Sequence, residues 1–288
     1  MRFGTRILFG LSAVSILVTS SESRAAIMGV QNVVTSVDGA GNRAFISAGF
    51  IGSTTTFDAS NIGTFTDGKL MYGNNTYGWN DPAPRDVSTS GNVYPANPDR
   101  ADWSSPFGAE GLSKGTLGEV FGGNNLSHII DSEDNGAWKI DLFFGPGLRL
   151  YSDGMNNTPE LAIFERGGNS DLGIKGILFD GVNYSYTSGL VLLRSQFTYA
   201  GWTLDTLEIS GAQKVYGLGL DLTDLGDVSQ GLVGIRLYSE AQFNGPDIVG
   251  VLTGVPVPEP GTLALLTVAL TLLGRPVRRV TRLRQSAA

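Results

Sequence analysis

The turn that follows the apolar run Leu161–Phe164 carries the residues best suited to bind a cation. Glu165, Asn169 and Asp171 lie around two glycines, and carboxylate and amide oxygens are the ligands that Ca²⁺ prefers. A structural role accounts for the same residues, because Arg166 can pair with a nearby carboxylate and Asn169 can hold a tight turn. We expect the structural role here and keep Ca²⁺ binding as the alternative.

Two further acidic clusters offer oxygen ligands at short spacing. Asp131, Glu133 and Asp134 precede a predicted strand, and their spacing resembles part of a calcium loop, although the complete EF-hand pattern is absent. The segment 221–227, Asp-Leu-Thr-Asp-Leu-Gly-Asp, has three aspartates and predicts one short helical turn. We expect both clusters to be solvated turns and keep Ca²⁺ binding as the alternative.

Four tryptophans are candidate platforms for a sugar ring. Trp138 and Trp202 lie beside predicted strands, and we expect them in the core, where most large aromatic side chains are found. Trp79 and Trp103 belong to a long segment rich in Asn and Pro, centred on residues 72–102. These two are the better candidates for stacking against a glycan.

Catalytic chemistry has little support in the composition. The chain has no cysteine, which excludes thiol nucleophiles and thiolate metal sites, and its single histidine, His128, cannot build a His-rich zinc site. Paired carboxylates can hydrolyse glycosides, but no motif places two of them at the required separation. We therefore expect a protein that is not an enzyme, with a glycan hydrolase as the least favoured alternative.

The first 25 residues have the pattern of a secretory signal peptide. Arg2 and Arg6 precede an apolar run over Ile7–Val18, and small residues stand before a cleavage site between Ala25 and Ala26. The apolar run is too short to span a membrane comfortably. We expect signal peptidase to remove residues 1–25 on export.

The exported part of the chain is strongly acidic. Between Ala26 and Pro260 there are 12 Lys and Arg against 26 Asp and Glu, a net charge of −14. Such a charge excludes the basic surface by which proteins bind nucleic acid. It suits an extracellular protein, or one that uses carboxylates to hold Ca²⁺.

The C-terminal segment 255–288 has three parts in a fixed order. It begins with a proline-rich motif formed by Pro258, Glu259 and Pro260. An apolar stretch at 262–274 follows, and as a helix it rises about 20 Å, so it spans the roughly 30 Å hydrocarbon core only if flanking arginines snorkel and the bilayer thins. The basic end contains Arg275, Arg278 and Arg279. Because arginines favour the cytoplasmic side, the body is expected outside the cell.

This tail resembles the Pro-Glu-Pro C-terminal sorting signal (PEP-CTERM) of exosortase substrates. The body is also similar to a family of exosortase-dependent surface proteins. The similar blocks, which appear in the order of the family between Asp99 and Val251, are Asn124–Asp134, Glu160–Leu172, Ala200–Trp202, Gln213–Val215 and Asn244–Asp247. The resemblance implies export and processing by an exosortase-type enzyme, but it implies no ligand and no reaction.

The body between residues 26 and 254 reads as a chain of short strands. Apolar or alternating runs are broken by turn residues, a pattern typical of an all-β sandwich or barrel. The predicted strands are Val30–Val37, Arg43–Phe50, Trp138–Phe144, Leu148–Ser152, Glu160–Glu165, Gly173–Phe179, Val191–Phe197, Thr203–Ile209, Val215–Leu220 and Val233–Tyr238. The predicted tight turns include Asp67-Gly68, Asp153-Gly154 and Asp180-Gly181.

We expect one jelly-roll-like antiparallel β-sandwich, interrupted by a long irregular loop at 72–102. A signal peptide precedes it and a short membrane helix follows. The expected function is that of a non-enzymatic bacterial protein that passes through the inner membrane to the cell surface or extracellular matrix. The alternative is a carbohydrate-binding module for exopolysaccharide.

Overall fold

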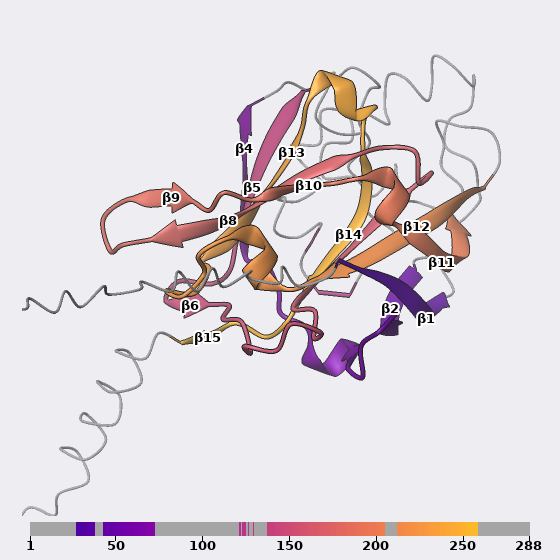
Figure 1. The fold of residues 1–288 in the computed structure, drawn as a ribbon, viewed down its shortest axis with the longest axis horizontal. Coiled ribbons are helices and arrows are strands. Elements are labelled where there is room, and N and C mark those ends of the chain that lie inside the picture. The colour runs from indigo at the N-terminus through magenta and orange to yellow at the C-terminus, as the bar shows by residue number, and fades with distance from the viewer. Residues whose placement is uncertain are drawn as a thin grey trace, which may run out of the picture.

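The computed structural model describes residues 27–37, 43–72, 121, 123, 124, 126, 129, 137–204 and 212–258. Two large antiparallel sheets and one two-stranded sheet make up this part of the chain (Figure 1). The all-β, antiparallel fold class predicted from the sequence is therefore confirmed. The long loop predicted at 72–102 lies outside the described residues apart from Tyr72, which ends a strand.

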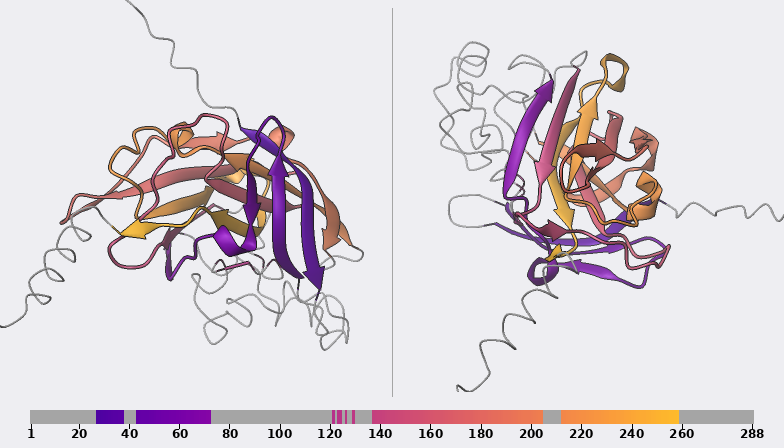
Figure 2. Two further views of the ribbon diagram at one scale, coloured as in Figure 1. Left: turned by 90° about the horizontal axis from the view of Figure 1, so that it is seen from below. Right: turned by 90° about the vertical axis from the view of Figure 1, so that its left-hand side faces the viewer.

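The larger sheet has seven strands in the order β14-β7-β12-β1-β2-β3, and β11 also pairs with β12. Its strands are β1 (Met28–Val37), β2 (Arg43–Phe50), β3 (Thr56–Asp58), β7 (Leu161–Arg166), β11 (Thr198–Leu204), β12 (Gln213–Leu220) and β14 (Asp247–Thr253). Strand β1 pairs with β12 only through its first two residues and then with β2, with register shifts along the way. Such irregularities bend a sheet, and the strands β1 and β2 accordingly stand at an angle to the rest (Figure 2).

The second sheet has six strands in the order β10-β8-β13-β5-β4, and β9 also pairs with β8. Its strands are β4 (Asp67–Tyr72), β5 (Trp138–Phe143), β8 (Leu172–Phe179), β9 (Tyr184–Tyr186), β10 (Leu190–Leu192) and β13 (Gly234–Ser239). The hairpin of β8 and β9 projects from one side of the molecule (Figure 1). A third pairing joins β6 (Leu148–Arg149) to β15 (Val257–Pro258).

The first core fills the space between the two large sheets. Trp138, Ile140 and Leu142 of β5 pack there with apolar residues of β7, β8, β12, β13 and β14. Their alternation along β5 places every second side chain on the same face. Two sheets that share one apolar core are the basic architecture of a β-sandwich.

The second core covers the opposite face of the seven-stranded sheet. It gathers aromatic and aliphatic side chains from β1, β2, β7, β11, β12 and β14. Phe164 of β7 lies 6.2 Å from Phe45 of β2, measured between ring centroids. Glycines of β12 make room for these rings, since a Cβ added at Gly217 would lie 2.8 Å from the Phe164 ring, and one at Gly219 only 2.5 Å from that of Phe50.

Strand β7 is therefore buried on both faces along its whole length. Leu161 and Ile163 enter the first core, and Ala162 and Phe164 enter the second. A strand buried on both faces has a continuous apolar run rather than an alternating one, which is what the segment Leu161–Phe164 shows. The strand predicted at Glu160–Glu165 is confirmed with a shift of one residue.

Several predicted boundaries were wrong. Asp67-Gly68 begins strand β4 instead of forming a tight turn, because both residues pair with β5 opposite Phe143 and Leu142. The strand expected over Val191–Phe197 ends at Leu192. There Leu193 and Gln196 close a 3₁₀ turn, in which the Leu193 amide donates to the Gln196 side chain at 2.7 Å. At Asp67-Gly68, pairing with β5 outweighed the turn propensity of the two residues. After Leu192, the hydrogen bond between Leu193 and Gln196 outweighed the strand propensity of the segment.

Other boundaries also differ from the prediction. Strand β11 lies at Thr198–Leu204, before most of the predicted Thr203–Ile209, and β6 covers only the first two residues of Leu148–Ser152. Strands β3, β4, β9, β14 and β15 had no counterpart in the prediction. The helical turn predicted within 221–227 is confirmed as the 3₁₀ helix η4 (Leu222–Leu225), and the Asp153-Gly154 and Asp180-Gly181 turns are confirmed by the positive φ of Gly154 and Gly181.

Substitution Phe164→Ala should test the double burial of β7. Removing a fully buried phenylalanine ring costs about 3–5 kcal/mol through lost burial and a residual cavity, so the free energy of unfolding measured in urea should fall by that amount. Val182→Ala, at a side chain 81% exposed on the β8–β9 hairpin, should change it by less than about 0.5 kcal/mol. Equal effects of the two variants would contradict the assignment of Phe164 to a core.

Candidate functional site

The turn after β7 carries the chain from the seven-stranded sheet into β8 of the six-stranded sheet. Gly167 and Gly168 have φ of +100° and +67°, a backbone region that residues with a side chain rarely occupy. A Cβ at Gly168 would also lie 2.6 Å from the Tyr216 ring. The tight turn predicted at this place is therefore confirmed, and it depends on both glycines.

Glu165 is buried at the end of β7 and holds this turn. Its Oε2 accepts the Gly168 amide at 2.6 Å. Burial, and next the nearby Asp247 carboxylate, raise the pKa of Glu165 well above its ordinary value. Burial thus favours the protonated form of this carboxyl group, which is the form less suited to bind Ca²⁺.

Arg166 is paired, as the structural reading of the turn predicted. Its guanidinium Nη2 lies 2.9 Å from Asp247 Oδ2, and its side chain is only 1% exposed. Asp247 begins β14 and stands directly opposite Arg166 in the β7–β14 register. The ion pair thus links two neighbouring strands at the rim of the sheet.

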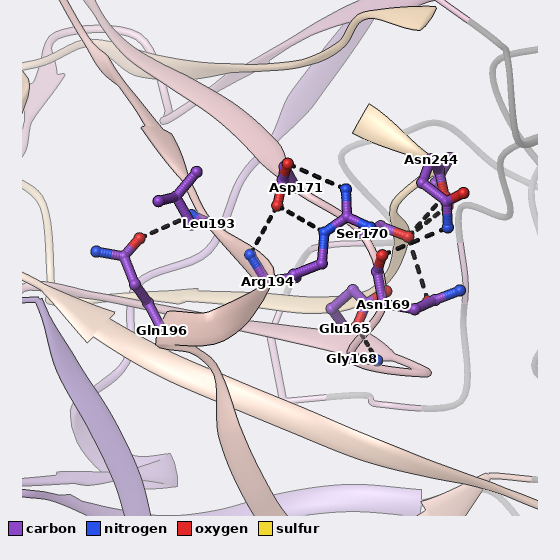
Figure 3. A network of polar contacts seen from close by, with 10 residues as sticks. Glu165, Gly168, Asn169, Ser170, Asp171, Leu193, Arg194, Gln196 and Asn244 are labelled. Atoms are coloured by element: carbon purple, nitrogen blue, oxygen red, sulfur yellow. Dashed lines mark hydrogen bonds and ion pairs between the residues drawn. The ribbon is translucent and has the colours of Figure 1, made fainter. Parts of the chain in front are cut away.

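Asp171 and Asn169 make separate contacts on the other side of the turn (Figure 3). Asp171 accepts the Arg194 backbone amide at 2.8 Å and forms a two-point ion pair with its guanidinium at 3.0 and 3.1 Å. The Arg194 hydrogen bond, opposed in part by burial, lowers the pKa of Asp171. Asn169 is exposed, and its carbonyl accepts from the Asn244 side chain at 3.4 Å.

A buried serine joins the turn to the loop before β14. Ser170 Oγ donates to the carbonyl oxygens of Asn244 and Gly245, at 2.7 and 3.1 Å. The Asp171 amide donates to the Phe243 carbonyl at 2.9 Å. These hydrogen bonds hold the two loops together at the corner.

The three residues considered for Ca²⁺ at this turn, Glu165, Asn169 and Asp171, therefore have different partners. In the part of the chain that the structure describes, no three His, Cys, Asp or Glu side chains lie close enough to hold a metal ion. The acidic group Asp131, Glu133 and Asp134 falls outside that part, and Ca²⁺ binding there stays a prediction.

Two of the three aspartates of segment 221–227 have structural roles in the described fold. Asp221 caps η4, where its Oδ1 accepts the Thr223 amide at 2.8 Å. Asp227 accepts the Ser229 amide at 3.0 Å. The interpretation of this segment as a turn is thus supported by its hydrogen bonds.

A second buried carboxyl group, Glu160, lies near η4. It accepts the amides of Asp153 and Leu222 at 2.8 and 2.9 Å. Burial raises the pKa of Glu160 to about 7, and the neighbouring Asp221 and Asp153 carboxylates add to the increase, against the effect of the two amides. This group therefore titrates in the physiological range.

The outer face of the six-stranded sheet contains a pocket that sequence reasoning missed. We call it the aromatic pocket. It has a volume of about 970 Å³ and is lined by Thr66, Asp67, Asp141, Phe143, Phe144, Gly145, Pro146, Gly147, Leu148, Phe179, Tyr184, Tyr186 and Val233. Its available signal was the alternation Tyr184-Ser-Tyr186 directly after the Asp180-Gly181 turn, which is typical of a hairpin strand. Only tryptophans were considered as platforms for a sugar ring in the sequence, and this pocket was therefore not predicted.

A buried polar network forms one wall of the aromatic pocket. Arg236 of β13 binds Asp141 of β5 through two hydrogen bonds, Nε to Oδ1 at 2.6 Å and Nη2 to Oδ2 at 2.8 Å. Tyr186 donates its hydroxyl hydrogen to Asp141 Oδ2 at 2.8 Å, and its ring lies 3.8 Å from the Arg236 guanidinium carbon. Burial raises the pKa of Tyr186, as does the bond to Asp141. The tyrosine is therefore a neutral donor at physiological pH.

The other predicted site residues divide into described and undescribed ones. Trp138 and Trp202 are buried in the two cores, as predicted. Pro258 of the sorting motif ends β15. The remaining predicted residues lie outside the described part: Ala25, Ala26, Trp79, Trp103, Glu259, Pro260, Arg275, Arg278 and Arg279. Within that part no helix is long and apolar enough to cross a bilayer; the segment 262–274 is not included in it.

Comparison with known proteins adds no assignment. No protein-family model, no curated protein and no solved structure matches the chain.

The two arginines of the corner give a matched test of its architecture. Arg166→Ala removes a fully buried guanidinium and the ion pair that it forms with the partly buried Asp247 carboxylate, so the free energy of unfolding should fall by about 3–5 kcal/mol. Arg194→Ala removes a side chain that is 42% exposed and should cost less than about 1 kcal/mol. Urea denaturation of both variants measures the difference, and an Arg166→Ala protein as stable as Arg194→Ala would refute the structural role.

The raised pKa of Glu160 predicts how stability changes with pH. A carboxyl group that binds its proton more tightly when folded stabilises the fold below its unfolded pKa. That contribution is lost as the pH rises through the folded pKa. The free energy of unfolding should therefore decrease between pH 5 and pH 8, and Glu160→Gln should flatten this dependence. Glu240→Gln, at an exposed position, should retain the wild-type slope. A slope in Glu160→Gln equal to that of the wild type would exclude Glu160 as its source.

Proposed function

We propose that this chain is an exported bacterial protein of the cell surface or extracellular matrix. In this proposal signal peptidase removes residues 1–25, and an exosortase-type enzyme processes the inner-membrane intermediate at Pro258-Glu259-Pro260. The segment 262–274 serves as the membrane anchor and the arginines that follow it stay on the cytoplasmic side. The protein acts by binding rather than by catalysis.

The observation that carries the proposal is the order of three segments in the sequence: the motif Pro258-Glu259-Pro260, the apolar stretch 262–274 and the arginines that follow it. Strand β15 finishes at Pro258, the first residue of the motif. Within the described part, neither core contains a residue after Leu252. Cores that are complete by Leu252 support a tail that can be cut off without loss of either core.

The body also holds the chain firmly up to the motif. The Gly254 amide donates to the Glu160 carbonyl at 2.8 Å, Pro256 is buried, and Val257 pairs with Arg149 of β6. A processing enzyme must therefore meet the motif directly beside a folded domain. The two sheets about one core support the finer expectation of a single jelly-roll-like sandwich as that domain.

Replacement of Pro258, Glu259 and Pro260 by alanine should test the sorting signal. If the motif is the recognition element, the triple variant should accumulate unprocessed in the inner membrane, because the enzyme needs the extended proline-rich segment. Cell fractionation and mass spectrometry of the full chain measure this. Val255→Ala, an exposed neighbour outside the motif, should be processed normally. A triple variant with wild-type mass and normal surface delivery would overturn the proposal.

A further inference from the structure

The aromatic pocket presents an exposed tyrosine on a built aromatic support. Tyr184 of β9 is 58% exposed, although most large aromatic side chains bury their surface. Its ring centroid lies 4.8 Å from that of Phe179 and 5.4 Å from that of Phe143. Three rings from β5, β8 and β9 thus form one platform on the outer face of the sheet, away from both cores.

The position of this platform is fixed by polar contacts on either side of Tyr184. On one side the Asp180 carboxylate accepts the amides of Val182 and Asn183 at 2.8 and 2.7 Å, which shapes the hairpin turn. On the other side Tyr186 is bound to Asp141, which is itself almost fully buried and paired with Arg236. A side chain held in one place loses little further conformational entropy on binding, and this favours affinity.

The chemistry of the pocket fits a carbohydrate. A sugar ring has an apolar face of C–H groups that packs on an aromatic ring, and hydroxyl groups around its edge that seek acceptors. Thr66 and Asp67 place an exposed hydroxyl and an exposed carboxylate at the same pocket as the three rings. The volume of about 970 Å³ lies in the range of small-molecule sites and suits a few sugar units.

The charges of the pocket argue against an acidic ligand. Of the described side chains that line it, the charged ones are both carboxylates, Asp67 and Asp141. The guanidinium of Arg236 is already bound to Asp141. An anionic glycan or a nucleic acid would meet a carboxylate, in a body with a net charge of −14, and such like-charge contacts cost several kcal/mol.

We propose that the aromatic pocket binds a neutral oligosaccharide segment of an exopolysaccharide. The Tyr184 ring stacks on one sugar ring, and Phe143 and Phe179 hold the Tyr184 ring in place. The Asp67 carboxylate accepts a hydrogen bond from a sugar hydroxyl group. Asp141 and Arg236 are positioning residues, because they act through Tyr186 and the strand β9. This site is separate from Trp79 and Trp103, the tryptophans expected to bind a glycan. It is also independent of the sorting signal, because the pocket would remain even if the alanine variant of the motif showed that Pro258-Glu259-Pro260 is not a sorting signal.

Titration of the full chain with neutral oligosaccharides tests the proposal. The probes are hexasaccharides of glucose, mannose, xylose and N-acetylglucosamine, and an alginate hexasaccharide serves as the anionic counterpart. Calorimetry should detect binding of at least one neutral probe and weaker or no binding of alginate. Tyr184→Ala should reduce the affinity about tenfold through the lost stacking contact, whereas Tyr184→Phe should retain it within about twofold.

The matched control is Tyr199→Ala. Tyr199 is 45% exposed and also packs on a second aromatic ring, that of Tyr216, but it lies on β11 of the other sheet. Its removal should leave the affinity unchanged, and thermal melts of all three variants show whether they remain folded. The proposal is overturned if no neutral probe binds, if alginate binds more tightly, or if Tyr184→Ala and Tyr199→Ala have the same affinity.

Discussion

The arrangement of this protein depends on one strand, β7, that is buried on both faces. Polar groups in such a strand are costly, because a buried charge without a partner loses its hydration without compensation. Yet β7 ends in Glu165 and Arg166, which are both almost fully buried. Arg166 is matched by Asp247 of β14, and Glu165 accepts the amide of Gly168. These contacts set the register of β14 against β7 and the path of the turn that leads into the other sheet. The charged corner is therefore part of the architecture of the fold.

Matched buried charges are also found on the outer face of the six-stranded sheet, at the aromatic pocket and away from the two apolar cores. Both cores lie on the faces of the seven-stranded sheet, so among the described residues the outer face of the six-stranded sheet takes little part in the apolar packing. On that face the Asp141–Arg236 pair is bidentate and joined by Tyr186, so a buried charge is again fully matched. Here the matched pair does not close a corner but supports an exposed aromatic platform. A surface built in this way can change its side chains and its ligand with little effect on the cores.

The C-terminal end of the body bears on the processing proposed above. The chain stays bound to the fold through Gly254, the buried Pro256 and the short pairing of β15 with β6. Leu148 of β6 also lines the aromatic pocket, so the proposed binding site and the proposed sorting signal lie at neighbouring places in the fold. On this basis a surface protein released from its membrane anchor would keep its binding face intact.

Much of this could be predicted from the sequence, because the relevant signals are local. Alternating apolar runs such as Arg43–Phe50 and the glycine turn at 167–168 correctly indicated an antiparallel all-β fold, and the charged pair after Phe164 indicated a structural corner. Composition alone excluded thiol and His-rich zinc chemistry. Only the tertiary structure identified Asp247 as the partner of Arg166, 81 residues away. Likewise, it alone brought Phe143, Phe179 and Tyr184 to one pocket and moved Asp67-Gly68 from a turn into an edge strand. The physical reason is that strand pairing in a sandwich joins residues distant along the chain, and which strands become neighbours depends on how both sheets bury their faces together.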